Sequence, residues 1–208
     1  MNPQIHGPRT ARKIGKQVSQ ADQESIITLG DITWDRFQAI KASFQGLQAV
    51  RLFYLAGVLE IISPPSRKHE RIKSTLGLLL EAYMKEKGIR FYLCGKFPIE
   101  KTGYAYGAPD DSYCISSDKD VPDIVIEVIM TSGALDKLEL YKQIEVPEVW
   151  LCQSNQLRIF NLRKEEYHEV PRSRFFPDLD LALLLRYIDY PDQYDAVQEF
   201  QAVIRGDL

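Results

Sequence analysis

The chain has 208 residues, a formal net charge of −3, 45% hydrophobic residues and 26% charged residues. This composition is typical of one globular domain and excludes a largely disordered chain, a collagen and a disulfide scaffold. No apolar run approaches the ~20 residues of a membrane helix, and the first 20 residues lack the apolar core of a secretory signal.

The charge is unevenly spread along the chain. Residues 1–20 contain four basic side chains and no acid, which leaves 22 basic and 29 acidic side chains in the remainder. Any contact with DNA must therefore use a local basic patch or a bound metal, or be weak. We expect residues 1–25 to form a flexible basic leader, with phosphate contact as the alternative, and residues 26–208 to form a single domain. The basic residues of the leader are Arg9, Arg12, Lys13 and Lys16.

The first predicted elements are a helix and a hairpin. Thr33 begins a helix whose apolar residues recur at helical spacing, at Phe37, Ile40 and Phe44. The short apolar runs 51–54 and 58–62, on either side of Ala56-Gly57, predict a β-hairpin.

A long helix follows the hairpin. Ser66 is the expected N-cap, and Gly88 follows the last helical residue, Lys87. The apolar stripe of this helix has the spacing of a buried face and consists of Ile72, Leu76, Leu79, Leu80 and Tyr83.

The rest of the chain alternates strands with helices. The run 122–130 is almost continuously apolar, which indicates a central strand covered on both faces. Gly133 ends it. Further strands are expected at 90–94, 97–101, 111–115, 148–152, 157–162 and 167–170, and further helices at 134–144, 178–188 and 193–204. This order predicts an α/β (α+β) fold, in which a mixed central sheet is flanked by helices.

Three residues of this frame could perform chemistry. Glu127 lies within the apolar central strand, where a carboxylate is costly unless it is paired or binds metal. Asp110 follows Pro109 at the start of another strand, and Lys137 lies on the apolar face of the next helix. Two carboxylates can hold a hard divalent cation that activates water, and the lysine can stabilise charge on a phosphorane. The alternative is a structural ion pair of Glu127 with Lys137, and a surface acid at Asp110.

Pro109-Asp110, Glu127 and a following lysine resemble the PD-(D/E)XK nuclease superfamily. More specifically, residues 30–190 resemble the Uma-two family of bacterial endonucleases, which implies a restriction-endonuclease-like core. The resemblance lies in ordered blocks at 57–64, 69–70, 108–113, 122–128, 131–132, 137–141 and 146–150.

The resemblance implies further roles for residues of these blocks. It makes Glu60 a third metal-site acid, and an exposed strand glutamate is the alternative. Helical spacing, rather than the resemblance, directs His69 toward the sheet, where it would contact metal-bound water or phosphate or pack as a core histidine, and directs Glu70 toward solvent. The superfamily lysine usually stands two residues after the acid, where this chain has Ile129. In the Uma-two family the lysine typically lies on the next helix, which Lys137 matches, and an acid often stands where this chain has Ile129, so its absence weakens a second metal position.

The resulting hypothesis is a Mg²⁺- or Mn²⁺-dependent deoxyribonuclease with Asp110, Glu127, Lys137 and His69 in catalysis and Asp110, Glu127 and Glu60 as metal ligands. A non-catalytic nucleic-acid or protein interaction module and an RNA hydrolase are the alternatives. We expect no membrane contact and consider a homodimer, because a duplex has two strands to cut. The scattered Cys94, Cys114 and Cys152 predict reduced thiols in a cytoplasmic protein rather than a three-cysteine metal site.

Overall fold

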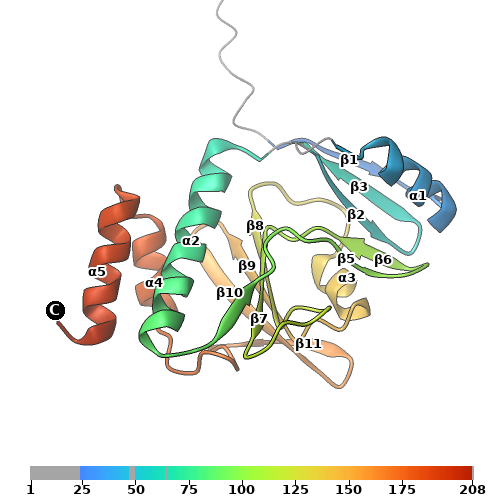
Figure 1. The fold of residues 1–208 in the computed structure, drawn as a ribbon. Coiled ribbons are helices and arrows are strands. Elements are labelled where there is room, and N and C mark those ends of the chain that lie inside the picture. Colours follow the sequence, from blue (N-terminus) through green and yellow to red (C-terminus); the bar gives the residue numbers. More distant parts are fainter. Residues whose placement is uncertain (1–23, 47–49, 64, 208) are drawn as a thin grey trace, which may run out of the picture.

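The computed structural model describes residues 24–46, 50–63 and 65–207 and folds them into helices and two sheets (Figure 1). The helices are α1 (Trp34–Ser43), α2 (Arg67–Glu86), α3 (Lys137–Gln143), α4 (Leu181–Ile188) and α5 (Gln193–Arg205). The strands are β1 (Ile26–Leu29), β2 (Arg51–Leu55), β3 (Val58–Ile62), β4 (Phe91–Leu93), β5 (Ile99–Lys101), β6 (Ala105–Gly107), β7 (Asp111–Ile115), β8 (Ile124–Ile129), β9 (Glu148–Gln153), β10 (Gln156–Arg163) and β11 (Glu166–Val170).

The larger sheet has six strands in the order β11-β10-β9-β8-β7-β4. Its strands β8 and β9 run parallel, with α3 in the crossover between them, and the other pairs are antiparallel. The predicted mixed sheet with flanking helices is therefore confirmed, and its architecture is consistent with a restriction-endonuclease-like core. The predicted hairpin, β2 and β3, belongs to a second sheet of five antiparallel strands in the order β1-β3-β2-β6-β5.

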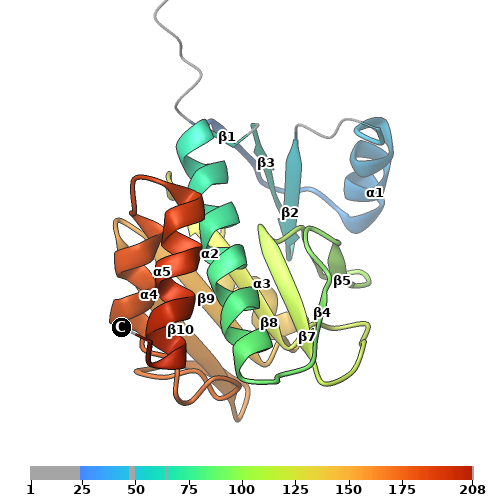
Figure 2. The same ribbon diagram turned by 60° about the vertical axis from the view of Figure 1, so that its left-hand side comes forward.

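The elements stack in layers (Figure 2), and separate apolar cores lie between them. Helices α2, α4 and α5 cover one face of the six-stranded sheet and bury the largest core with it. A second core lies between the other face of that sheet, α3 and the five-stranded sheet, and includes Phe53, Val125 and Tyr141. Helix α1 packs on the outer face of the smaller sheet through Phe37.

Local capping explains where the helices begin and end. Ser66 Oγ accepts a hydrogen bond from the backbone N–H of His69 (3.1 Å), and Gly88 follows the helix with φ 65°. The bounds predicted for α2 are therefore confirmed. Helix α3 begins later than predicted, because Asp136, rather than a residue near 134, caps it by accepting from the N–H groups of Leu138 and Glu139.

Two short strands were not predicted. Strand β1 pairs with β3 at the edge of the smaller sheet, and β6 lies between β2 and β5. Each has only three or four residues, too few for a recognisable period. Residues 1–23 of the expected leader, with its basic residues, lie outside the described residues, whereas Glu24 and Ser25 are described and contact the domain.

Within the described ranges, no helix is both long and apolar enough to cross a membrane.

Candidate functional site

Strand alternation carries several polar side chains into the second core, between the two sheets. Arg51 shares a face of β2 with Phe53, Glu60 shares a face of β3 with Ile62, and Glu127 shares a face of β8 with Val125. The apolar member of each pair belongs to that core. Because side chains two residues apart point the same way on a strand, the charged members are directed inward as well.

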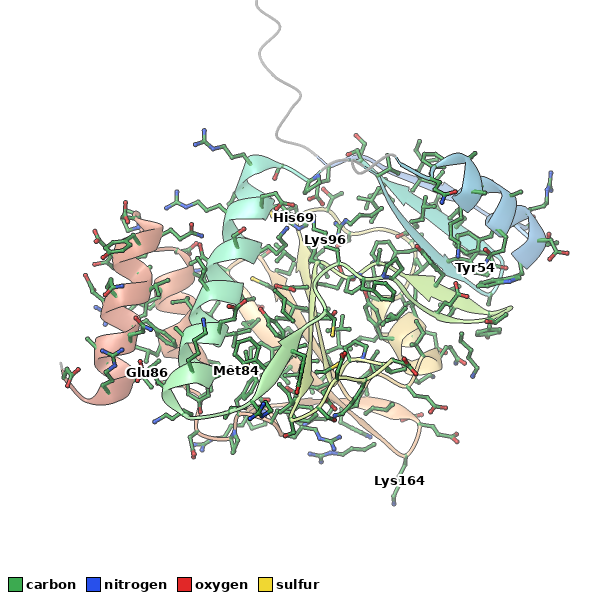
Figure 3. The ribbon with its side chains drawn as sticks, viewed as in Figure 1. Tyr54, His69, Met84, Glu86, Lys96 and Lys164 are labelled. Carbon is green, nitrogen blue, oxygen red and sulfur yellow. The ribbon has the colours of Figure 1, made fainter. Side chains whose placement is uncertain are left out.

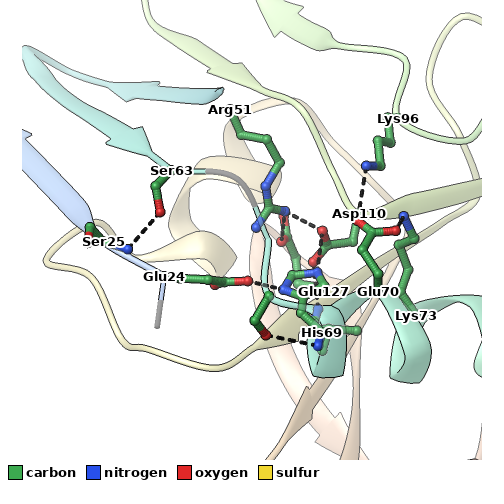
Figure 4. A network of polar contacts seen from close by, with 12 residues as sticks. Glu24, Ser25, Arg51, Ser63, His69, Glu70, Lys73, Lys96, Asp110 and Glu127 are labelled. Carbon is green, nitrogen blue, oxygen red and sulfur yellow. Dashed lines mark hydrogen bonds and ion pairs between the residues drawn. The ribbon is translucent and has the colours of Figure 1, made fainter. Parts of the chain in front are cut away.

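A cavity of about 210 Å³ lies at this junction. Its charged lining residues are Glu24, Arg51, Glu60, Glu127, Asp136 and Lys137. Asp110 does not line the cavity but contacts Arg51, which does (Figure 4). The residues predicted to bind metal therefore gather in one region, with Arg51 among them.

Asp110 is buried, with 2% of its surface exposed, so its interpretation as a surface acid is wrong. Its Oδ1 accepts hydrogen bonds from Arg51 Nη1 and from His69 Nε2 (2.8 Å), and its Oδ2 accepts one from the N–H of Val128 (2.8 Å). Burial alone would raise the pKa of Asp110, but the hydrogen bond from His69 and the charge of Arg51 hold it below its usual value.

His69 lies in the first turn of α2, at the opposite end of the helix from Met84 and Glu86 (Figure 3). The imidazole is fully buried between two carboxylates, with Nδ1 bonded to Glu24 and Nε2 to Asp110. Burial alone would lower the pKa of His69, but these two hydrogen bonds raise it to about 9. The ring is therefore protonated at neutral pH and donates to both partners. It faces the sheet as predicted, and it is also a hydrogen-bonded core residue.

Glu127 is buried on β8, with 2% exposure. Its Oε1 accepts a hydrogen bond from the Tyr141 hydroxyl, and its Oε2 lies 3.7 Å from Arg51 Nη1. Burial raises the pKa of Glu127 to about 7, against the opposing charge of Lys137. The carboxyl is therefore only partly ionised near neutrality, and a cation placed beside it would favour the ionised form.

Lys137 is the first residue of α3 and points inward, as its position on the helix predicts. Its Nζ is buried beside the ring of Phe53 and has no hydrogen-bond partner among the described residues. Burial lowers the pKa of Lys137 to about 7, although the charge of Glu127 opposes this shift. The structural ion pair with Glu127, which was the alternative interpretation, is not formed, because Tyr141 and Arg51 lie at the Glu127 oxygens.

Glu60 is only 1% exposed, so its interpretation as an exposed strand glutamate is wrong. Its Oε1 accepts a hydrogen bond from the N–H of Leu135 (2.7 Å) in the loop before α3. That loop approaches closely at Gly133, where an added Cβ would lie 2.4 Å from the same oxygen. By contrast, Glu70 is partly exposed and pairs with Lys73 and Lys96.

Sequence reasoning missed Arg51 and Glu24. Arg51 stands two residues before Phe53 on one face of a predicted strand, so the alternation could have placed it inside. Glu24 carries no comparable signal, because its partner His69 is 45 residues away.

The carboxylate oxygens around the cavity do not converge on a single position for a cation. Within the described ranges, the only three potential ligand residues with ligand atoms all within 4.8 Å of one another are Cys94, Cys114 and Asp118, away from the cavity. Cys152 is not part of that group. The acids that line the cavity are Glu24, Glu60, Glu127 and Asp136, against Arg51 and Lys137, and the buried pair of Asp110 and His69 lies beside it. The oxygen donors and the excess of acids fit a hard divalent cation such as Mg²⁺.

A family model described as Uma2, "Putative restriction endonuclease", matches residues 34–188. The match covers most of the chain, and the chain belongs to this family. No curated protein matches the sequence.

Proposed function

We propose that the protein is a metal-dependent endonuclease that hydrolyses phosphodiester bonds of DNA. The observation that supports this proposal is the meeting of Glu60, Glu127 and the unpartnered Nζ of Lys137 at one buried cavity. The Lys137 amine is buried without a hydrogen-bond partner among the described residues and its pKa falls to about 7, so its retention at this place favours a function that supplies an anion. A phosphodiester oxygen is such an anion.

Mg²⁺ or Mn²⁺ would be held by Asp110, Glu127 and Glu60, all of which offer carboxylate oxygens. When bound, the ion supplies polarisation of the phosphate and lowers the pKa of water. The family and the donor set support this assignment together.

The chain's own residues hold these groups in place. Lys137 would donate to a phosphate oxygen on which charge develops, in a cavity where water screens little. Tyr141 fixes the Glu127 carboxylate by its hydrogen bond, and His69 fixes Asp110. Glu24 in turn holds the other nitrogen of His69. His69 therefore acts as a positioning residue in this proposal rather than as a contact to phosphate.

A second candidate is a non-catalytic interaction module on the same fold. Two observations favour it: Asp110 is already satisfied by Arg51 and His69, and residue 129 is Ile rather than an acid. A module of this kind would bind its partner with or without a divalent ion.

Cleavage of supercoiled plasmid in Mg²⁺, in Mn²⁺ and in chelator tests the proposal. Asp110→Asn and Glu127→Gln each remove a charged oxygen, so either change should abolish metal-dependent cleavage while circular dichroism shows a folded protein. Glu139→Gln, at an exposed-face acid on α3, is the matched control and should retain activity. Wild type that binds DNA and cleaves neither duplex nor single strands would favour the interaction module. Cleavage of RNA alone would make the protein a ribonuclease.

The proposal also includes a cytoplasmic location and a homodimer. Cys94, Cys114 and Cys152 are free thiols, which supports a reducing cytoplasm. A homodimer would place two sites on the two strands of a duplex. Light scattering of the purified protein, with and without duplex, tests the dimer.

A further inference from the structure

Arg51 is the cation that Asp110 and Glu127 share. Its Nη1 donates to Asp110 Oδ1 and lies 3.7 Å from Glu127 Oε2, and its side chain is 10% exposed (Figure 4). A divalent ion bound by the same two carboxylates needs the oxygens that face this nitrogen. A guanidinium and a divalent cation at that place would repel each other at close range in a poorly screened interior.

Arg51 also borders a second cavity. An outer groove of about 530 Å³ is lined by Arg51 together with Lys41, Phe44, Lys96 and Tyr106, among others. Lys96 is half exposed and pairs with Glu70, and Lys41 pairs with Glu100 (3.2 Å) and lies 4.6 Å from the centre of the Tyr106 ring. The phosphates of a nucleic-acid strand could compete with these surface acids for the two lysines.

The Arg51 side chain is not fully satisfied where it lies. Its Nε is buried and has no hydrogen-bond partner in the described part of the chain. The guanidinium thus neutralises two acids at the cost of one unpaired donor. Arg51 lines both the inner cavity and the outer groove, so the groove is a neighbouring space into which its side chain could turn.

We propose that Arg51 is the resident cation of the metal-free site and that it exchanges with the divalent ion, turning into the outer groove to meet a phosphate of the bound strand. This inference rests on the proposed function and adds a way in which nucleic-acid binding regulates metal binding at the site. The ion and the nucleic acid then assist each other: the ion releases Arg51 from Asp110, and the phosphate gives the guanidinium a new partner. By thermodynamic linkage the assistance is reciprocal, so each ligand tightens the binding of the other.

The first test is the affinity for Mn²⁺, measured by titration calorimetry on the full chain. Arg51→Gln removes the competing charge at similar length, so Mn²⁺ should bind on the order of tenfold tighter than to wild type. Arg158→Gln, at an exposed arginine paired with Glu169, is the matched control and should leave the affinity unchanged. Low-millimolar guanidinium should weaken Mn²⁺ binding to Arg51→Gln and leave wild type unaffected, because the free cation refills the vacated position.

The second test is the coupling between ion and DNA. Addition of a short duplex should tighten binding of Ca²⁺ to wild type, and Arg51→Gln should lose most of that gain. If Arg51→Gln does not fold, Arg51→Lys takes its place, since a lysine lacks the forked reach to both acids. Tighter Mn²⁺ binding to Arg51→Lys than to wild type then supports the exchange.

The outcomes separate this inference from the proposed function. Equal or weaker Mn²⁺ binding to the Arg51 variant, with wild type binding Mn²⁺, overturns the exchange and leaves the nuclease proposal standing. The exchange is also overturned, and the nuclease proposal stands, if Asp110→Asn loses cleavage while Arg51→Gln keeps the full coupling between divalent ion and duplex. Absence of Mn²⁺ binding to both wild type and variant overturns both proposals.

Discussion

The Tyr141 hydroxyl donates a hydrogen bond to Glu127 Oε1 in the interior, where neither residue is more than 2% exposed. Tyr141→Phe would leave that oxygen without its donor and keep the ring. We expect a loss of about 1–3 kcal/mol in the free energy of unfolding, because a buried acceptor becomes unsatisfied. Urea denaturation at neutral pH measures it.

Tyr167→Phe is the comparison for this change. The Tyr167 hydroxyl donates to a neutral backbone carbonyl, that of Val146 (2.6 Å), so its loss should leave Mn²⁺ affinity unchanged. Tyr141→Phe should weaken Mn²⁺ binding as well as stability, because Glu127 would ionise less readily. Equal Mn²⁺ affinities in the two variants would contradict a role of Tyr141 in holding a metal ligand.

Replacement of Lys137 should separate stability from activity. Lys137→Met keeps the length and removes a buried ammonium that has no hydrogen-bond partner in the structure described above. We expect metal-free protein to gain ~1–2 kcal/mol in the free energy of unfolding, because the desolvation penalty disappears. Cleavage should fall by roughly 10²- to 10³-fold, as for removal of one charge-stabilising donor. Lys142→Met, on the same helix and paired with Glu139 near the surface, should alter neither quantity appreciably.

The free energy of unfolding should depend on pH through the protonation of His69. Its pKa in the fold is about 9, above the ordinary value of 6.5, so the folded state binds the proton more tightly. The stability it contributes is fully present below pH ~6.5 and is lost as the pH rises through ~9. The difference in free energy of unfolding between wild type and His69→Gln should therefore shrink by up to ~3 kcal/mol between pH 6 and pH 10. A difference that stays constant over this range would refute the charged imidazole.

Gly133 should tolerate no side chain, for a reason specific to Glu60. A Cβ at this position would lie 2.4 Å from Glu60 Oε1, so Gly133→Ala must displace the carboxylate. The N–H of Leu135 then loses its acceptor, and we expect a cost of about 1–3 kcal/mol and weaker Mn²⁺ binding. Gly30→Ala is the control, because no atom lies within 4 Å of its added Cβ. Thermal melts with and without Mn²⁺ distinguish the two effects.

Much of the frame follows from local patterns in the sequence. The long stripe of α2, its Ser66 cap and the apolar run of β8 each contain their own signal, and the structure reproduces them. Glu127 was conspicuous for the same reason: an acid within an apolar strand has few explanations. The inward direction of Lys137 came from helical spacing alone.

The parts of the site that could not be predicted depend on contacts between segments far apart in the sequence. Arg51 meets Asp110 across 59 residues, and Glu24 meets His69 across 45. No local period reports such a pair, and an arginine at the start of a strand commonly faces solvent. The alternative of a structural ion pair between Lys137 and Glu127 fails for the same reason, since Arg51 approaches Glu127 from another sheet.

The partnership of Glu24 with His69 also determines how short an expression fragment can be. The family match begins at residue 34, ten residues beyond Glu24, and ends at residue 188, before α5. A fragment cut at those limits would remove the Nδ1 partner of His69, leave the outer edge of β3 unpaired, and strip Phe200 from the largest core. Such a fragment should aggregate or melt early, and inactivity measured on it would reflect the cut rather than the chemistry of the intact protein.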